Sequence, residues 1–298
     1  MFTKSKISTP LFKRVCGVAG NCCAVAEQGS VSRAAQALNY VQSNITARLR
    51  KLEDELGNEL FYRKSRGMGL TPAGENLLGY ARKMLLLAEE ARSVVAGSDN
   101  LNGKLTIGSM ETTAAIRLPS CLVDFHERYP EVEMVLQTGT TGELRQMVLD
   151  YKLEGAFVGG TFDHPDIVQE EIFREEMVLV TKKGYTGLSD PRVCALIGFR
   201  QGCSYQRQLE DWLAELGRPP LKVMQFGSLE AILGCVMAGM GVTFMPKAVM
   251  DHERYGRELT VHPVPENFAV IPTVFVRRRD MAPSANLQAF LGVVHPQA

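Results

Sequence analysis

The chain has 298 residues, a net charge of zero and 45% hydrophobic residues, and these figures exclude several classes of protein. Two or three compact units are expected at this length, and so much apolar content excludes disorder over most of the chain. No run of about eighteen uncharged apolar residues occurs, so we expect no transmembrane helix. The seven cysteines and five histidines follow neither a disulfide framework nor a metal-ligand spacing. We therefore expect a cytoplasmic protein with reduced thiols, no metal and no cofactor.

The zero net charge conceals an asymmetry along the chain. Residues 1–70 hold 11 Lys and Arg against 5 Asp and Glu, whereas residues 101–298 hold 19 against 24. A basic first part favours an anionic partner, of which nucleic acid is the first candidate and an anionic membrane surface the second. The membrane is disfavoured because the basic residues lie on a helix-turn-helix pattern and not on one amphipathic basic helix.

The first 103 residues are typical of helices with short extended pieces between them. Helices are predicted over 15–27, from Ser30 or Ser32 to Leu38, and over 41–56, where Gly57 ends the third helix. Extended pieces on either side of the loop 65–69 predict a wing. A long helix is predicted from Thr71-Pro72 to about Val95, followed by a linker at 96–103.

From residue 104 onwards strands alternate with helices, which predicts an α/β fold with a largely parallel sheet and helices on both faces. The strands are expected at 104–108, 133–138, 154–159, 177–181, 195–199, 223–227, 241–246 and 273–278. The helices are expected at 113–129, 142–150, 204–216, 228–239 and 284–293. The pattern fits either one large unit or two smaller ones with crossing connections.

The first three helices, with a tight turn between the second and the third, have the spacing of a helix-turn-helix. Amides suit adenine edges and arginine suits guanine. We therefore expect DNA sequence to be read from the third helix by Gln42, Ser43, Asn44, Thr46 and Arg48. Flanking basic residues are expected to contact phosphates, which position a protein without reading sequence; they are Arg33, Arg50, Arg63, Lys64 and Arg66.

Residues 25–78 contain, in order, the motifs GS-x-SRAA-x-x-L, QS, R-x-LE-x-ELG, LF-x-R and LT-x-AG-x-x-LL. This segment resembles the N-terminal signature of LysR-type transcriptional regulators. The resemblance implies recognition by the five third-helix residues above and backbone contacts by Arg33, Arg50 and Arg63. Three departures stand out: Tyr40-Val41 replaces the usual small polar residues, Ala47 replaces a common Arg or Lys, and Asn21-Cys22-Cys23 replaces bulky apolar residues.

The resemblance extends over nearly the whole chain and implies its organisation. A winged helix-turn-helix is expected at 1–70, a dimerisation helix at 71–96, a hinge at 97–103 and an effector domain at 104–298. The effector domain would have the fold of type 2 periplasmic binding proteins, with two Rossmann-like lobes: lobe I at 104–180 and 268–298, and lobe II at 181–267. Such proteins bind double-stranded promoter DNA and a small-molecule effector, and RNA polymerase is a further candidate partner.

The predicted helix 71–96 carries a broad apolar face. Its apolar residues cover more than half of the circumference, and they are Leu77, Leu78, Met84, Leu85 and Leu87. A lone exposed helix does not keep such a face in water, so it must pack on another chain or on the body. The resemblance implies the former, an antiparallel dimer and then a dimer of dimers.

Four segments rich in hydroxyls follow predicted strands, at the sheet edge where ligands bind in α/β proteins. Taken singly, such Ser and Thr residues are most often helix caps, but their clustering favours a pocket. The expected effector-binding residues are Ser109, Met110, Glu111, Thr112, Thr138, Gly139, Arg200, Gly202, Cys203, Ser204, Gly227 and Ser228. Arg200 suits an anionic ligand and Glu111 a cationic one, so the sequence leaves the charge of the ligand open.

Two alternatives stay open at this point. Cys203 stands near the position of the reactive cysteine in the family's peroxide-sensing member, which gives a redox-sensing regulator as the first alternative. A packed or pocket-lining thiol is favoured, because Trp212 stands near the place where a resolving cysteine is needed. The second alternative is a two-lobed solute-binding protein without a DNA function. An enzyme is not expected, since no nucleophile elbow, P-loop or dinucleotide-binding motif occurs.

Overall fold

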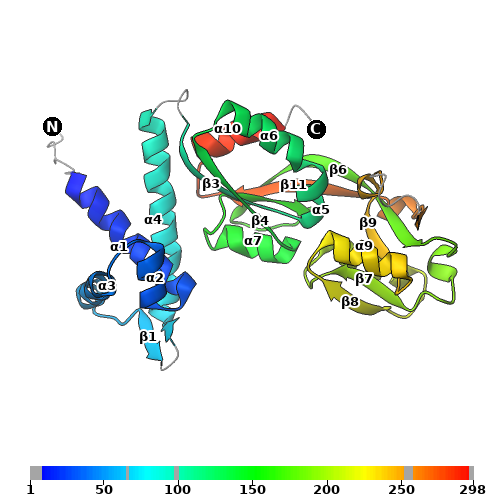
Figure 1. Ribbon diagram of the computed structural model, residues 1–298, viewed down its shortest axis with the longest axis horizontal. Coiled ribbons are helices and arrows are strands. Elements are labelled where there is room, and N and C mark those ends of the chain that lie inside the picture. Colours follow the sequence, from blue (N-terminus) through cyan, green and yellow to red (C-terminus); the bar gives the residue numbers. More distant parts are fainter. Residues whose placement is uncertain (1–8, 65–66, 97–100, 252–257, 295–298) are drawn as a thin grey trace. The chain divides into compact units, whose positions relative to one another are not determined.

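The computed structural model describes residues 9–64, 67–96, 101–251 and 258–294. The chain divides into two compact units, Met1–Ser98 and Asp99–Ala298, and each is described by itself (Figure 1). Within these residues no helix combines the length and the apolar character needed to cross a membrane.

The first unit consists of helices around a small core and a two-stranded hairpin. Its elements are α1 (Thr9–Gln28), α2 (Val31–Ala37), α3 (Gln42–Leu56), β1 (Phe61–Lys64), β2 (Gly67–Leu70) and α4 (Pro72–Ala96). Gly57 ends α3 with a left-handed φ of 64°, as the sequence predicted. The antiparallel pair β1–β2 is the predicted wing, with Phe61 opposite Leu70.

Helix α1 is longer than predicted, because it begins at Thr9 and not at Val15. Its unusual Asn21-Cys22-Cys23 segment is buried and forms part of the packing of the unit. Cys22 contacts the cluster that includes Ile45 and Leu49 of α3. Burial raises the pKa of the Cys22 thiol to about 12 and that of the Cys23 thiol to about 11. Both cysteines therefore act as small core residues and not as reactive thiolates.

Part of the apolar face of α4 packs against other helices of the first unit. The sequence predicted packing of this face on another chain or on the second unit. Leu78 packs with Ala19 and Cys23 of α1, and Leu77 joins the core around α3. The rest of the face stays open in the single chain, because Tyr80, Met84 and Leu87 are exposed large hydrophobics. The exposed apolar strip of α4 is therefore narrower than the apolar face predicted from the sequence.

The second unit is built on one mixed sheet and a smaller parallel pair. Its strands are β3 (Gly103–Ser109), β4 (Val132–Thr138), β5 (Gly155–Gly159), β6 (Ile167–Lys182), β7 (Ala195–Phe199), β8 (Lys222–Phe226), β9 (Thr243–Pro246), β10 (Leu259–His262) and β11 (Val270–Arg278). Among the described residues, seven of these strands form one sheet. Six of them follow the order β10-β6-β11-β5-β3-β4, and the seventh, β9, pairs with β6. The other two, β7 and β8, pair in parallel.

The α/β class is confirmed, but the expectation of a largely parallel sheet is wrong. Strand β6 pairs antiparallel with β9, β10 and β11, and β11 pairs antiparallel with β5. Parallel pairing occurs between β3 and its neighbours β4 and β5, and between β7 and β8. The cause is the long strand β6, whose charged first half hid it from the sequence pattern and which, with β11, connects the two lobes (Figure 1).

Helices lie on both faces of these strands. They are α5 (Glu111–Ile116), α6 (Leu118–Arg128), α7 (Thr141–Leu149), α8 (Ser204–Glu215), α9 (Leu229–Ala238) and α10 (Ala285–Val294). Helices α6 and α10 cover one face of lobe I and α7 the other (Figure 1). The single helix predicted over 113–129 is two helices that meet at Arg117, because α6 restarts with Pro119 in its first turn.

The two lobes share a continuous hydrophobic core. Leu144 and Val148 of α7 in lobe I belong to the same buried cluster as Leu209 and Leu213 of α8 in lobe II. Clusters of their own lie under α6 and α10 in lobe I and under α9 in lobe II. Because buried side chains join α7 to α8, separating the lobes would expose apolar surface to water.

An ion pair lies where the lobes meet on β6. Arg117 Nε donates to Glu175 Oε1 at 3.0 Å and Arg117 Nη2 to Oε2 at 2.8 Å. The Glu175 side chain is 4% exposed and that of Arg117 is 35% exposed. The Arg117 guanidinium also lies 5.6 Å from the centre of the Phe173 ring. The two-point bond to Glu175 raises the pKa of Arg117.

Replacing Arg117 with Met should destabilise the second unit, because the Glu175 carboxylate then stays buried without its partner. We expect a loss of about 3 kcal/mol, at the low end for a broken buried pair since Arg117 is partly exposed. Urea unfolding followed by the fluorescence of Trp212, the single tryptophan, measures this loss. The control Arg174→Met breaks an exposed pair with Glu171 and should cost less than about 1 kcal/mol. Equal losses in the two variants would contradict a structural role for the buried pair.

Candidate functional site

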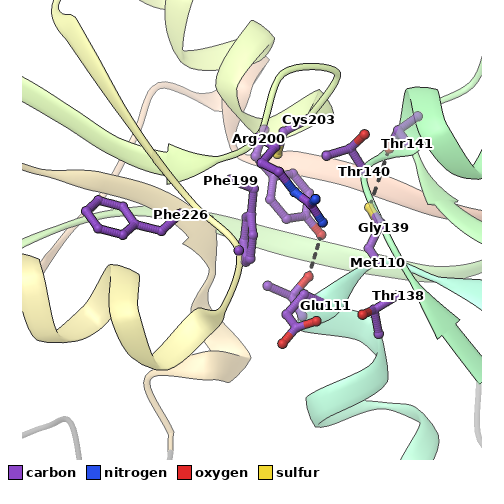
Figure 2. Close-up of a pocket in the computed structure, with 13 residues that line it drawn as sticks. Met110, Glu111, Thr138, Gly139, Thr140, Thr141, Phe199, Arg200, Cys203 and Phe226 are labelled. Carbon is purple, nitrogen blue, oxygen red and sulfur yellow. Dashed lines mark hydrogen bonds between the residues drawn. The ribbon is translucent and has the colours of Figure 1, made fainter. Parts of the chain in front are cut away.

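A pocket lies between the two lobes at the carboxyl ends of their strands. Its volume, counted together with its opening to solvent, is about 430 Å³. One wall follows β3 and β4 of lobe I, and the other follows β7 and β8 of lobe II (Figure 2). The lining residues are Met110, Glu111, Thr112, Thr138, Gly139, Thr140, Thr141, Phe199, Arg200, Cys203, Tyr205, Phe226 and Gly227.

Most residues that the sequence assigned to a ligand site lie on this pocket. They are Met110, Glu111, Thr112, Thr138, Gly139, Arg200, Cys203 and Gly227. The other four serve the protein's own structure. Ser109 is fully buried and donates to the carbonyl of Met110, and Ser228 caps α9 by accepting from the Ala231 amide. Gly202 and Ser204 make the contacts between lobes described below.

Sequence reasoning missed three lining residues, Phe199, Tyr205 and Phe226, whereas Thr140 and Thr141 belong to the hydroxyl-rich segment that follows the predicted strand 133–138. Phe199 and Phe226 are the last residues of β7 and β8 and lie opposite each other in the parallel register. The predicted strands, 195–199 and 223–227, miss this register by one residue, because aligning them by their ends places Phe199 opposite Gly227. No comparable signal existed for Tyr205, whose position depends on the packing of α8 against lobe I.

Hydrogen bonds join the two walls behind the pocket. The hydroxyls of Thr112 and Tyr205 lie 3.1 Å apart, and Thr141 Oγ1 donates to Ser204 Oγ at 3.4 Å. The Gly142 amide donates to the carbonyl of Gly202 at 3.2 Å. Tyr205 is fully buried, and this burial raises the pKa of its phenol well above the ordinary value, so the phenol stays neutral.

Two of the four helix starts at the pocket, those of α7 and α9, are capped by the protein's own side chains, whereas α5 and α8 begin without a side-chain cap. Thr140 and Glu143 form a capping box at the start of α7, and Ser228 caps α9. The bonds to the Thr140 amide lower the pKa of the Glu143 carboxyl. The charged side chains that line the pocket are Arg200 from lobe II and Glu111 from lobe I (Figure 2).

Cys203 lines the pocket directly before α8. Burial raises the pKa of its thiol, and the amides of Gln206 and Tyr205 beside the sulfur offset this only in part. A reactive cysteine needs a lowered pKa. Cys203 therefore has the character of a pocket-lining thiol, as the sequence favoured. Among the described residues, no group of three or more side chains that could hold a metal ion occurs.

In the first unit, the start of α3 presents polar side chains to solvent. Gln42 and Ser43 are exposed and Asn44 is half-buried. Ser32 of α2 donates its hydroxyl to Gln42 Oε1 at 3.0 Å, which leaves the Gln42 amide group free to donate outward. Thr46 donates to the carbonyl of Gln42 within the helix, so its hydroxyl proton is already engaged.

The basic residues of the first unit differ in their surroundings. Arg33 and Arg50 are exposed. The guanidinium of Arg48 lies 5.3 Å from the centre of the Tyr40 ring, and the side chain of Arg48 is half-buried. The side chain of Arg63 and the whole of Arg66 lie outside the described residues. The two units therefore present separate sites, an exposed polar helix start and a pocket between lobes.

Comparison with known proteins finds matches over both units. A family model described as "LysR substrate binding domain" matches residues 98–298. A second, "Bacterial regulatory helix-turn-helix protein, lysR family", matches residues 22–75. The HTH-type transcriptional regulator GltR of Bacillus subtilis is 44% identical over 270 residues, covering 89% of this chain and 91% of that protein. The regulator SoxR of an Arthrobacter species is 42% identical, with 91% and 93% covered.

Solved structures share the fold along nearly the whole chain. A full-length OxyR variant from Pseudomonas aeruginosa has a TM-score of 0.71 and 21% identity, covering 94% of this chain and 93% of that one. CbnR, solved with its target DNA, has a TM-score of 0.64 and 24% identity, with 95% and 99% covered. ArgP from Mycobacterium tuberculosis has a TM-score of 0.68 and 16% identity, with 94% and 95% covered.

The raised pKa of Cys203 predicts slow reaction with alkylating agents. At pH 8 we expect iodoacetamide to modify Cys203 about tenfold or more slowly than the exposed Cys194, because only the thiolate reacts. Since the pKa lies above the ordinary thiol value, the rate at Cys203 should still rise steeply above pH 9. Peptide mass spectrometry after timed alkylation measures both rates. Faster modification of Cys203 than of Cys194 would revive the redox-sensing alternative.

Proposed function

Because this chain belongs to the LysR family of transcriptional regulators, we propose that α3 reads promoter DNA and that an effector between the lobes changes this reading. The family membership rests on the matches over both units. The observation that carries the proposal is the pocket, which takes one wall from each lobe. A ligand that contacts both walls binds one arrangement of the lobes more tightly and shifts the population towards it.

Gln42 is the residue we propose to read a base edge. It is exposed at the first position of α3, and its bond from Ser32 fixes the orientation of the amide. A held amide loses less conformational freedom when it binds a base. Ser43, Asn44 and Thr46 would add further contacts along the same helix. Arg33, Arg50, Arg63 and Arg66 would contact phosphates, since arginine pairs well with a phosphate oxygen.

Replacing Gln42 with Ala should reduce discrimination between specific and random DNA. We expect a loss of about 1–3 kcal/mol on the specific site and little change on random DNA. Ser32→Ala should give a smaller loss of the same kind, because it frees the Gln42 amide without removing it. Gel-shift titrations on the chain's own upstream intergenic DNA, across a salt series, measure both effects.

The control for Gln42 is Gln225→Ala, which changes an exposed glutamine of the second unit. It should bind both DNAs as the parent does. Arg33→Ala should weaken binding to both DNAs about equally. Equal losses on specific and random DNA for Gln42→Ala would remove the assignment of Gln42.

The effector we propose is a small zwitterion with an apolar part, such as an amino acid. Arg200 reaches the pocket from lobe II and Glu111 from lobe I, so the two charges stand on opposite walls. A carboxylate would pair with Arg200 and an ammonium with Glu111, because charges that leave water need partners. The apolar part would lie against the ring of Phe199, which stands between the two walls (Figure 2).

This assignment predicts that binding requires both charged groups of the ligand. Isothermal calorimetry with the common amino acids identifies the best binder. The matching acid without the amine and the matching amine without the carboxylate should then bind about tenfold or more weakly, since each lost charged hydrogen bond contributes about 1.5–3 kcal/mol.

Matched variants test the same point from the side of the protein. Arg200→Gln should weaken the amino acid about tenfold or more and leave the binding of the amine unchanged. Glu111→Gln should do the reverse with the acid. Arg207→Gln, an exposed arginine of α8 that does not line the pocket, should change nothing. Equal binding of the amino acid and the acid would contradict the zwitterion and leave a simple anion.

We also propose that two copies associate through α4. The exposed strip of Tyr80, Met84 and Leu87 follows helical spacing on this element. Burying such a strip against a second copy would remove it from water. A two-fold pair of chains would place two α3 helices on one DNA site, with half-sites about one helical turn apart. The place of action would be the cytoplasm, where the chromosomal DNA of bacteria lies.

A further inference from the structure

An exposed valine stands at the start of α3, the helix that we propose to read DNA. Val41 is the N-cap residue of α3, with extended backbone angles of φ −80° and ψ 142°. Its side chain makes no capping hydrogen bond, and the residue is 68% exposed. Ser, Thr, Asp and Asn are the favoured residues at an N-cap, and valine is among the poor ones. The folding of α3 therefore does not explain a valine here.

The turn before α3 holds Val41 in place. Asn39 adopts a left-handed φ of 54°, and the Tyr40 amide donates to the carbonyl of Ala35 at 2.8 Å. The Asn44 amide donates to the carbonyl of Val41 at 3.0 Å. Valine has a stiff χ1 angle, so its methyl groups lose little freedom on contact. Val41 is thus a preorganised apolar group on the DNA side of the unit, next to Gln42.

Most other exposed large hydrophobics among the described residues of the first unit lie on other parts of the fold. Leu56 ends α3, Tyr62 lies on β1, and Tyr80, Met84 and Leu87 lie on α4. The neighbouring Tyr40 has the Arg48 guanidinium over its ring. Val41 stands beside the polar side chains of Gln42 and Ser43, within a surface that meets DNA.

The base edges of the major groove offer hydrogen-bond donors and acceptors and one apolar group, the methyl of thymine. An isopropyl group makes no hydrogen bond to a base or a phosphate, so its favourable partner there is this methyl. Resting on the DNA reading proposed above for α3, we infer that Val41 contacts a thymine methyl group in each half-site and is a specificity-determining residue beside Gln42. Ala47, also exposed on α3, adds no charge that would favour guanine.

The test separates the methyl group from every hydrogen bond of the base. A high-affinity duplex is first selected from random DNA with the full-length protein, and each thymine is then replaced by uracil in both half-sites. Uracil lacks only the methyl. For the parent protein we expect one position at which uracil weakens binding about fourfold per half-site, the effect of one buried methyl group.

Two variants assign that position to the side chain. In Val41→Ala the uracil penalty at this position should fall below about twofold, while penalties at other positions stay. Val41→Ser restores a favoured N-cap and therefore keeps α3 folded, and it should lose the same penalty. The control Val261→Ala changes an exposed valine of β10 and should keep the parent pattern.

Three results would overturn the inference. One is a parent protein with no uracil-sensitive position. Another is a penalty that persists in Val41→Ala and Val41→Ser, since another group then contacts the methyl. The third is a selection that enriches no sequence, because α3 then reads no base at all.

Discussion

The arrangement of the second unit depends on a buried carboxylate, that of Glu175, where the chain passes from one lobe to the other. Glu175 lies on the strand that passes from one lobe to the other, and Arg117 neutralises it through two hydrogen bonds. Arg117 also marks the junction of α5 and α6, and Ile116 beside it packs against the core of lobe II. The ion pair therefore holds the pocket wall formed by α5 against β6, because removing the partner of a buried charge strongly destabilises a protein.

The same constraint connects the pocket to the relative position of the lobes. Thr112 follows Glu111 on α5 and meets the buried Tyr205 of α8 across the pocket. Leu144 and Leu213 extend this contact as a shared apolar core. A ligand between Glu111 and Arg200 would contact both lobes beside these packed side chains. Its effect on the lobes would thus pass through packed side chains with few alternative arrangements.

The DNA-binding unit follows local folding rules over much of its described length, although Asn21 is buried in α1 without a hydrogen-bond partner for its side-chain amide. Gly57, the wing and the core residues Ile45 and Leu49 agree with local propensity and periodicity. Val41 at an N-cap goes against the local preference. Sequences break a local rule most often at functional positions, where a partner supplies the missing contact. The exposed valine and the anchored Gln42 are explained together by a groove that offers both methyl groups and hydrogen-bonding edges.

The sequence by itself determined the features that depend on neighbouring residues. The position of α3, its end at Gly57 and the placing of Met110, Glu111 and Arg200 at strand ends follow from periodicity, capping and chain order. Tertiary structure alone decided the pairing of Arg117 with Glu175, the contact of Thr112 with Tyr205 and the antiparallel course of β6. These contacts join residues far apart in the chain, and each depends on which elements pack together. No local pattern encodes that choice. The first half of β6 is rich in charged residues, as an exposed segment would be, although this strand passes from one lobe to the other.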